Sequence, residues 1–452
     1  MIRRLRSAVV AVTAAAALAA GCGPGRIVRR GQVNDDAMAW VRRRLVDVRG
    51  LSFRTPVLAQ VLDRESLRDM LAREIELSYH PDDIERLEAV YTRLGLLPPG
   101  TNLRAVLQRL YEAEGAGFYD PRTKRLMLAM HTVDTGGWWP GLVAFVLRRD
   151  LVGEMIVAHE LTHALQDQRW GIPSEPEPLL DAQGDRLLAR RALLEGDATL
   201  AALACVGGGT PDAGTIHAVT EGLHGVGAQL AERYPDVPDA VRATVAFEYD
   251  DGTTFAAWAL ASGGWSAVDR VQAEPPASTE QVLHPTRYYG RRDEPITLAV
   301  GGTEALEAAG WTRTLEDTLG ELNIRLLARR SLPAAQAAEV ADGWGGDRLR
   351  ALARGGDLVL VWMTAWDSPA DAGEFAAAMP ELLRGARVER RETRVLVLLG
   401  PDGGPRVDLD RLAGAVWRSS GAAGVTSPAG RTPRPPARRS APAPPRRCRR
   451  SR

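Results

Sequence analysis

The sequence predicts an α+β protein that is mostly helical up to about residue 314 and ends in a smaller α+β domain. Apolar residues recur at three-to-four spacing along most of the first part, which is the period of an amphipathic helix. Two short apolar runs around Asp120–Lys124 are typical of a β-hairpin. Farther on, two strand-like runs at 358–362 and 395–399 flank a helical pattern at 370–383.

Residues 1–21 have the pattern of an export signal. Three Arg are followed by an apolar run of small residues that is too short to span a membrane. The run ends at Leu18-Ala19-Ala20-Gly21-Cys22, which resembles a bacterial lipobox, although the Leu lies one place earlier than in the commonest pattern. We therefore expect export to the bacterial cell envelope and membrane anchoring through a lipid on Cys22. Ordinary secretion and an uncleaved anchor are the alternatives. Residues 22–34 are expected to form a tether.

Helical patterns dominate the chain after the tether. Residues 35–110 form an N-terminal helical region, interrupted at Pro98-Pro99-Gly100. After the hairpin, helices are expected at about 151–168, 185–206, 216–234 and 240–260. The domain that contains the hairpin and these helices is expected to span residues 111–314.

The C-terminal part has a different composition. Residues 315–420 are expected to form the smaller α+β domain, and residues 421–452, rich in Pro and Arg, are expected to be disordered. The formal net charge is zero, but three Arg lie in residues 1–21 and nine after residue 421. The body between them is therefore acidic, which argues against nucleic acid as a partner.

The motif His159-Glu160-Leu161-Thr162-His163 lies on the helix predicted at 151–168. The two histidines are four residues apart, so they lie on one helix face, about 40° apart, and can share a metal ion. Glu160 can reach a water on that metal and act as general base, and zinc is the expected metal. The opposite helix side is an apolar stripe: Val157, Leu161 and Leu165. The alternative is a pair of surface or core histidines beside a solvated glutamate.

A catalytic zinc ion needs a third protein ligand. A metzincin would have Gly at position 166 and His at 169, where this chain has Gln166 and Arg169. The helix predicted at 185–206 instead offers Glu195 in the stretch Glu195-Gly196-Asp197-Ala198-Thr199. A histidine pair followed by Glu on a second helix resembles the gluzincin clan of zinc peptidases. Residues 117–206 are similar to a family of predicted bacterial lipoprotein metallopeptidases.

The resemblance implies a zincin-like catalytic domain over 111–314, with His159, His163 and Glu195 as zinc ligands and Glu160 as general base. In the clan, the residue four after the Glu often supports a histidine, and that place is taken by Thr199 here. In such folds the strand before the metal helix lines the cleft and pairs with an extended peptide. Residues 125–129 are therefore expected to be that edge strand, with an ordinary edge strand as the alternative.

Several residues are candidates for supporting the metal site. Asp167, four residues after His163, is expected either to orient the imidazole ring or to be a solvated residue near the helix end. Asp197 points about 160° away from Glu195 on a regular helix and is not expected to touch the metal. His217 and His224, beyond a triple glycine, are the rival metal ligands or else surface residues.

The candidates for the oxyanion donor follow a Pro-rich loop in the sequence. His284 and Tyr288, with Tyr289 beside them, are the candidates, because a Tyr or His donor commonly stabilises the oxyanion in this chemistry. Trp138 and Trp139 either line a pocket or fill the core.

The expected function is that of a zinc-dependent metallohydrolase, a peptidase that acts on a peptide or protein substrate. A non-catalytic, zinc-containing binding lipoprotein is the alternative from another class. Glu160 argues against it, because a structural zinc site needs no general base. A zinc hydrolase of a non-peptide amide or ester is the third possibility.

Overall fold

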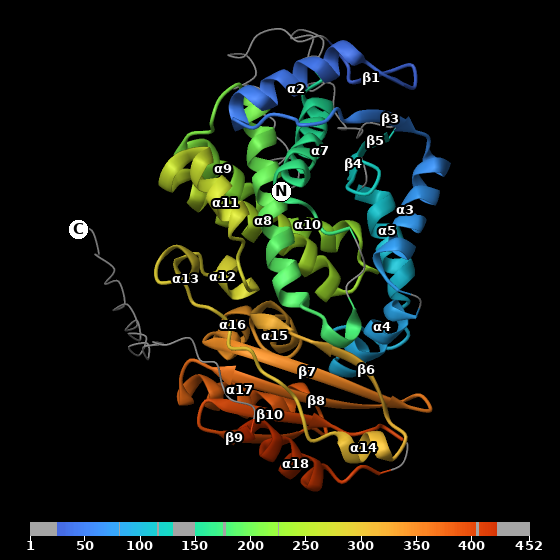
Figure 1. The fold of residues 1–452 in the computed structure, drawn as a ribbon, viewed down its shortest axis with the longest axis vertical. Helices are drawn as coiled ribbons and strands as arrows, with labels where there is room; N and C mark the ends of the chain where they lie inside the picture. Colours follow the sequence, from blue (N-terminus) through green and yellow to red (C-terminus); the bar gives the residue numbers. More distant parts are fainter. Residues whose placement is uncertain are drawn as a thin grey trace, which may run out of the picture.

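The computed structural model describes residues 25–80, 82–114, 117–129, 150–174, 178–224, 226–403 and 406–422. It confirms the α+β class, with a mostly helical unit at one end and a sheet-containing C-terminal unit at the other (Figure 1). Cys22 and the segment after residue 422 lie outside the described residues, so the export signal, the lipid anchor and the disordered tail stay predictions. Within the described ranges, no helix combines the length and apolar character needed to cross a membrane.

The helical unit contains short strands in two small sheets, which are followed by long helices. Its elements are β1 (Val28–Arg29), β2 (Gln32–Val33), α2 (Asp35–Arg49), β3 (Leu58–Leu62), α3 (Arg64–Ser78), α4 (Asp83–Leu94), α5 (Leu103–Glu114), β4 (Gly117–Asp120), β5 (Arg125–Ala129), α7 (Leu151–Trp170), the 3-10 helix η1 (Leu179–Asp181), α8 (Gly184–Gly207), α9 (Ala213–Leu223), α10 (Val226–Arg233), α11 (Asp239–Ala273), α12 (Thr279–Leu283) and α13 (Thr286–Tyr289).

The tether expected at residues 22–34 is wrong from residue 27 onward. Strands β1 and β2 pair as an antiparallel hairpin, and Ile27 beside them is 1% exposed. The backbone N–H of Ile27 donates to the Asp150 carboxylate just before α7. Burial of an apolar side chain stabilises the folded state, so Ile27 holds this segment against the fold.

The small sheet of the helical unit has the strand order β3-β5-β4. The predicted hairpin is confirmed as the antiparallel pair of β4 and β5. The prediction that Arg125–Ala129 is an edge strand is wrong, because β3 pairs with it in parallel on its other side. Strand β3 comes from a region expected to be wholly helical, and local pattern does not reveal a partner so distant in the chain. The edge strand that contacts α7 is β4.

The long helices α7, α8 and α11 pack together and carry the proposed chemistry (Figure 1). Helices α8 and α11 approach each other most closely at two glycines. A Cβ on Gly196 would collide with the carbonyl of Gly252, and a Cβ on Gly252 would collide with the carbonyl of Ala192. Only glycine therefore allows these two backbones to lie so close.

Helix α11 and the segment before it differ from the predicted pattern. The helix expected at 216–234 is two helices, α9 and α10, which are separated near His224. The helix expected at 240–260 continues to Ala273 through a kink at Gly263 and Gly264. Gly264 has a φ of 64°, a backbone conformation that glycine adopts readily.

The C-terminal unit is a five-stranded antiparallel sheet of order β6-β7-β8-β10-β9 with helices on both faces. Buried Trp344 and Phe375 lie in the core on the face covered by α17, and buried Leu412 and Trp417 of α18 cover the other. Its elements are α14 (Glu304–Ala308), β6 (Thr312–Asp317), α15 (Gly320–Ala328), α16 (Ala334–Ala341), β7 (Trp344–Arg354), β8 (Asp357–Trp366), α17 (Pro369–Leu382), β9 (Arg387–Arg391), β10 (Arg394–Leu399) and α18 (Leu409–Ala422).

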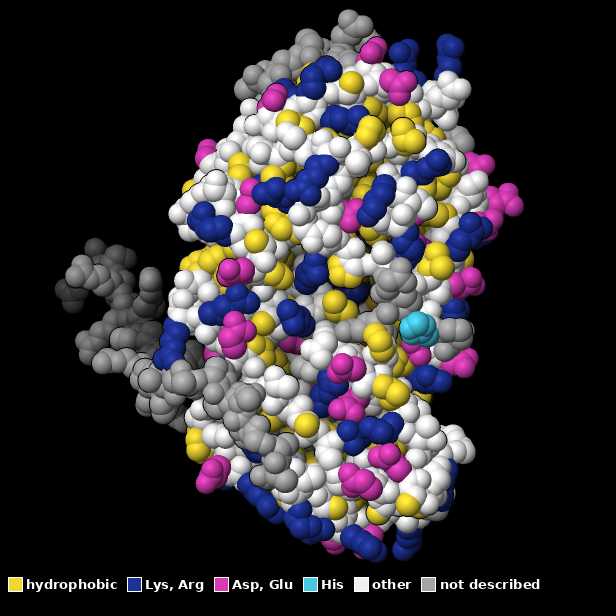
Figure 2. All heavy atoms as spheres, in the orientation of Figure 1, with side chains coloured by type: hydrophobic (Ala, Val, Ile, Leu, Met, Phe, Trp, Pro, Cys, Tyr) yellow, Lys and Arg dark blue, Asp and Glu magenta, His cyan; other side chains and the backbone are white. Residues whose placement is uncertain are grey.

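The face of the molecule drawn in Figure 2 carries Arg and acidic side chains interspersed with small apolar areas. Among the described residues on this face, no continuous basic stripe of the kind that follows a nucleic-acid backbone is seen.

Substituting Gly196 by Ala tests the close approach of α8 and α11. Alanine normally stabilises a helix interior by about 1 kcal/mol over glycine, but here overpacking should cost about 1–3 kcal/mol. The Gly196→Ala variant should therefore unfold at a lower temperature than the wild type in a calorimetric scan. Gly373→Ala in α17 is the matched control, because its added Cβ meets nothing within 4 Å and should raise the unfolding temperature.

Candidate metal centre

Helix α7 presents the two histidines of the motif to one side and its apolar stripe to the core. Val157 and Leu161 are fully buried and Leu165 is 2% exposed, as the sequence predicts. Asp150 caps the helix by accepting a hydrogen bond from the N–H of Gly153. The histidine side chains are only partly buried, so solvent reaches them.

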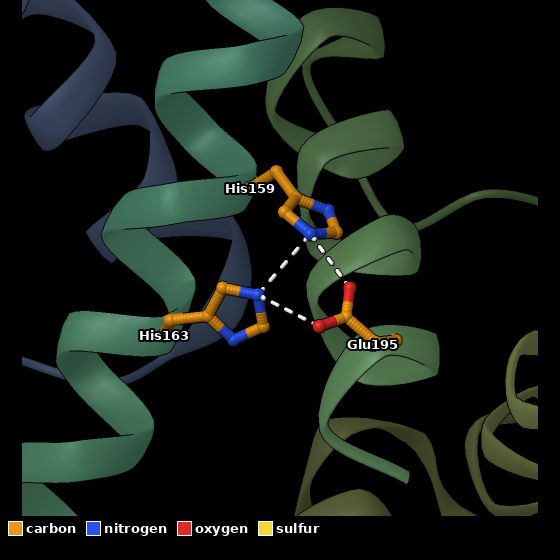
Figure 3. Close-up of side chains that lie close together, drawn as sticks. All are labelled: His159, His163 and Glu195. Carbon is orange, nitrogen blue, oxygen red and sulfur yellow. Dashed lines mark hydrogen bonds and ion pairs between the residues drawn. The ribbon is translucent and has the colours of Figure 1, made fainter. Parts of the chain in front are cut away.

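Glu195, from the middle of α8, faces both histidines (Figure 3). The Nε2 atoms of His159 and His163 are 3.2 Å apart. The Nε2 of His159 lies 3.0 Å from one Glu195 oxygen, and that of His163 lies 3.5 Å from the other. The three side chains therefore point at one spot between α7 and α8.

These separations fit a tetrahedral zinc ion. Zinc bonds nitrogen and carboxylate oxygen at about 2.0–2.2 Å, and tetrahedral angles then place neighbouring ligand atoms about 3.3 Å apart. The three measured distances scatter around that value. The donor set, two imidazoles and one carboxylate, is also one that catalytic zinc uses.

The charges at this spot favour a cation. Burial disfavours the charged imidazolium of His163, but the adjacent Glu195 carboxylate outweighs burial and raises the pKa of His163 from 6.5 to about 9. Burial alone would raise the pKa of the Glu195 carboxyl, and the two histidines instead hold it well below its usual range. The three side chains together stabilise a positive charge between them.

Glu160 is held beside the ligands by the edge strand. Its Oε2 accepts a hydrogen bond of 2.9 Å from the backbone N–H of Tyr119 in β4. Gly117, two residues earlier, has no side chain and lets β4 lie close against Ile156 and Glu160. One carboxylate oxygen of Glu160 is thereby fixed, and the other remains for chemistry.

Tyr249 of α11 is a site residue that the sequence did not identify. Its phenol lies near the Glu195 carboxylate, whose charge acts on it, and its ring stacks against His159 at 6.2 Å between centroids. The negative charge of Glu195, together with burial, raises the pKa of Tyr249 well above its ordinary value. Gly252, one turn later on α11, could have indicated this helix face from the sequence, because a glycine within a helix often marks a close approach.

The residues expected to support the histidines are not the ones that do. Asp167 does not contact His163; its carboxylate accepts from the Tyr119 hydroxyl and from the ammonium of Lys124, each at 2.7 Å. Thr199 is half-buried, and its hydroxyl has no hydrogen bond to any residue within the described ranges. The Nδ1 of His163 instead lies 2.9 Å from the side-chain oxygen of Gln166.

Gln166 leads in turn to a buried ion pair. Its amide nitrogen donates to the Leu194 carbonyl and to Asp197, each at 3.0 Å. Asp197 is fully buried and pairs with Arg49 of α2 at 3.0 Å, as well as accepting from Gln272 of α11. As expected, Asp197 does not face the metal position, yet only Gln166 separates it from His163. Asp197 lies among Leu193, Leu194 and Leu200, and an acid on an otherwise apolar helix side could have indicated this network from the sequence.

The candidates for the oxyanion donor lie elsewhere. His284 is paired with Glu321 of the C-terminal unit at 3.0 Å. Tyr288 and Tyr289 donate to the backbone carbonyls of Glu274 and Phe255. Each of the three is therefore committed to another contact, and none touches the two histidines and Glu195. Tyr249 replaces them as the candidate.

The rival ligands do not join the cluster either. His224 is 55% exposed and bonds the Asp250 carboxylate, and His217 lies on α9, away from the cluster. Trp138 and Trp139 lie outside the described residues.

A second group of acids in the described residues comprises Glu280, Asp293 and Asp367. The guanidinium of Arg287 lies among them and pairs with all three. A cationic side chain already supplies the positive charge there, so this group is an ion-pair cluster and not a second metal centre.

Comparisons with known proteins bear on the other end of the chain. Residues 308–426 match the model of a domain of unknown function, DUF8575. That stretch covers most of the C-terminal unit and does not include α7 or α8. No curated protein and no solved structure matches the chain.

The assignment of Glu195 can be tested by metal content. Two histidines alone bind zinc weakly, so Glu195→Ala should lose its zinc on dialysis against zinc-free buffer. His217→Ala and His224→Ala should each retain about one ion per chain, measured by plasma mass spectrometry. A fully loaded Glu195→Ala variant together with an empty histidine variant would show that the third ligand is misassigned.

Proposed function

We propose that this chain is a zinc-dependent metallohydrolase, and that it acts as a peptidase. One observation carries the proposal: the ligand atoms of His159, His163 and Glu195 lie 3.0–3.5 Å apart, as ligands of one tetrahedral ion do. The exposure of these side chains, between 14% and 21%, leaves room for a water and a substrate. A purely structural zinc site would be closed by a fourth protein ligand.

Zinc bound there supplies Lewis-acid chemistry, which polarises an acyl carbonyl and lowers the pKa of a water to about 7. Glu160 is the general base. The Tyr119 N–H holds its Oε2 atom, so Oε1 is the atom that takes a proton from the attacking water. The same oxygen can then deliver that proton to the leaving amine.

Tyr249 is the proposed donor to the oxyanion. Its phenol lies beside Glu195, and its raised pKa keeps the hydroxyl protonated at neutral pH. A protonated hydroxyl next to the metal position can donate to the carbonyl oxygen as negative charge develops on it.

Strand β4 favours a peptide over another acyl substrate. Among the described residues it pairs with β5 alone, and its other edge runs along α7 beside Glu160. An extended peptide can add to such an edge through backbone hydrogen bonds. We therefore assign to β4 the substrate-pairing role that the sequence had suggested for Arg125–Ala129.

Replacing Glu160 by Gln separates catalysis from metal binding. The amide keeps the size of the side chain and cannot take a proton, so the variant should retain one zinc ion and lose turnover by several orders of magnitude. Hydrolysis of a quenched fluorescent peptide library measures the turnover, and plasma mass spectrometry measures the zinc. Equal rates in both proteins would remove Glu160 as the base. A zinc-loaded wild type that cleaves no member would argue for the non-catalytic alternative.

Replacing Tyr249 by Phe tests the oxyanion donor. The ring and its packing remain, and the hydroxyl is lost, so kcat should fall about 100-fold while zinc content stays unchanged. Tyr288→Phe is the matched control and should keep kcat, because that hydroxyl binds the Glu274 carbonyl. Loss of zinc from Tyr249→Phe would show that the phenol only supports Glu195.

A further inference from the structure

The contacts of the Gln166 amide leave it only one orientation. Two hydrogen-bond acceptors, the Leu194 carbonyl and the Asp197 carboxylate, lie 3.0 Å from one end of the amide. The Leu194 carbonyl has no hydrogen to donate, and the two oxygens of the Asp197 carboxylate accept from two nitrogens of Arg49. The end that faces them must therefore be the NH₂ group, and the opposite end must be the oxygen.

That oxygen lies 2.9 Å from Nδ1 of His163. An amide oxygen only accepts, so Nδ1 must carry a hydrogen. In a neutral imidazole the other nitrogen then has a free lone pair, and Nε2 is the atom that faces His159 and Glu195. The tautomer that can ligate through Nε2 is thus set from outside the ligand shell.

We propose that Gln166, anchored by Asp197, is a positioning residue that holds the proton of His163 on Nδ1 and so reserves Nε2 for the metal. This inference rests on the proposed zinc site. Gln166 and Asp197 take over the supporting role that the sequence had suggested for Asp167 and Thr199. Such outer partners of a ligating histidine typically account for a 10- to 100-fold difference in metal affinity.

Gln272 provides a matched control. It donates to the same Asp197 carboxylate as Gln166, also at 3.0 Å, and comes from α11 without a contact to His163. Gln166→Leu and Gln272→Leu each remove one hydrogen bond from Asp197, and Gln166→Leu also removes the bond to the Leu194 carbonyl. Only the first removes the partner of Nδ1.

The experiment measures zinc affinity by competition with a chromophoric chelator, together with the unfolding temperature of the metal-free proteins. Gln166→Leu should bind zinc about 10- to 100-fold more weakly than the wild type, and Gln272→Leu should bind it equally well. Both should unfold at lower temperatures than the wild type, because each removes a donor from the buried Asp197 carboxylate. Equal zinc affinities of the two variants would overturn the proposal. A wild type that binds no zinc would overturn the proposed function itself, so the two failures are distinct.

A spectroscopic readout separates positioning from packing. In ¹⁵N-histidine-labelled protein saturated with zinc, the Nδ1–H of His163 should give a resonance protected from solvent exchange. Gln272→Leu should keep that protection and Gln166→Leu should lose it. Asp197→Asn should weaken zinc binding when it is the only substitution. It should have no further effect when it is added to Gln166→Leu, because Asp197 acts through Gln166. An equal effect in both backgrounds would remove Asp197 from this role.

Discussion

The structure of the site depends on one buried carboxylate. Asp197 accepts hydrogen bonds from Arg49 of α2, Gln166 of α7 and Gln272 of α11, and it belongs to α8 itself. A buried charge without such partners would cost several kcal/mol, so packing of the four helices that brings donors to Asp197 is favoured. The bond between Gln166 and Asp197 thus joins α7 to α8 next to Glu195 without involving the metal position.

Three consecutive residues of α8 face three different partners, because each residue turns the helix by about 100°. Glu195 faces the histidines, Gly196 faces the backbone of α11, and Asp197 faces the buried network. The glycine lets α11 come close enough for Tyr249 to reach the Glu195 carboxylate. A larger residue at 196 would separate the helices, and the phenol would lose its partner. The close packing of α8 and α11 at Gly196 is thus also what places Tyr249 beside Glu195.

Features that depend on residues close together in the chain were predicted from the sequence, and features that depend on distant segments were missed. The hairpin, the two helices and the grouping of His159 with His163 follow from spacing within a few residues, and the structure has each of them. The parallel pairing of β3 with β5, which moves the open edge to β4, joins segments more than sixty residues apart. Gln166 and Tyr249 were missed for a related reason, because their role depends on partners in other helices. The family match, confined to 308–426, bears on neither.

The C-terminal unit contributes to the site by holding the start of α8. The Asp317 carboxylate of β6 accepts from the N–H of Gly184, the first residue of that helix. Asp185 binds the backbone and hydroxyl of Thr279, and the same hydroxyl accepts from the Leu322 N–H in α15. One hydrophobic cluster continues from α8 and α11 into the sheet of the unit, so the contact is a shared core. Glu195 lies about three turns from this junction on a rigid helix, and a displacement of the unit would therefore move the carboxylate away from the histidines.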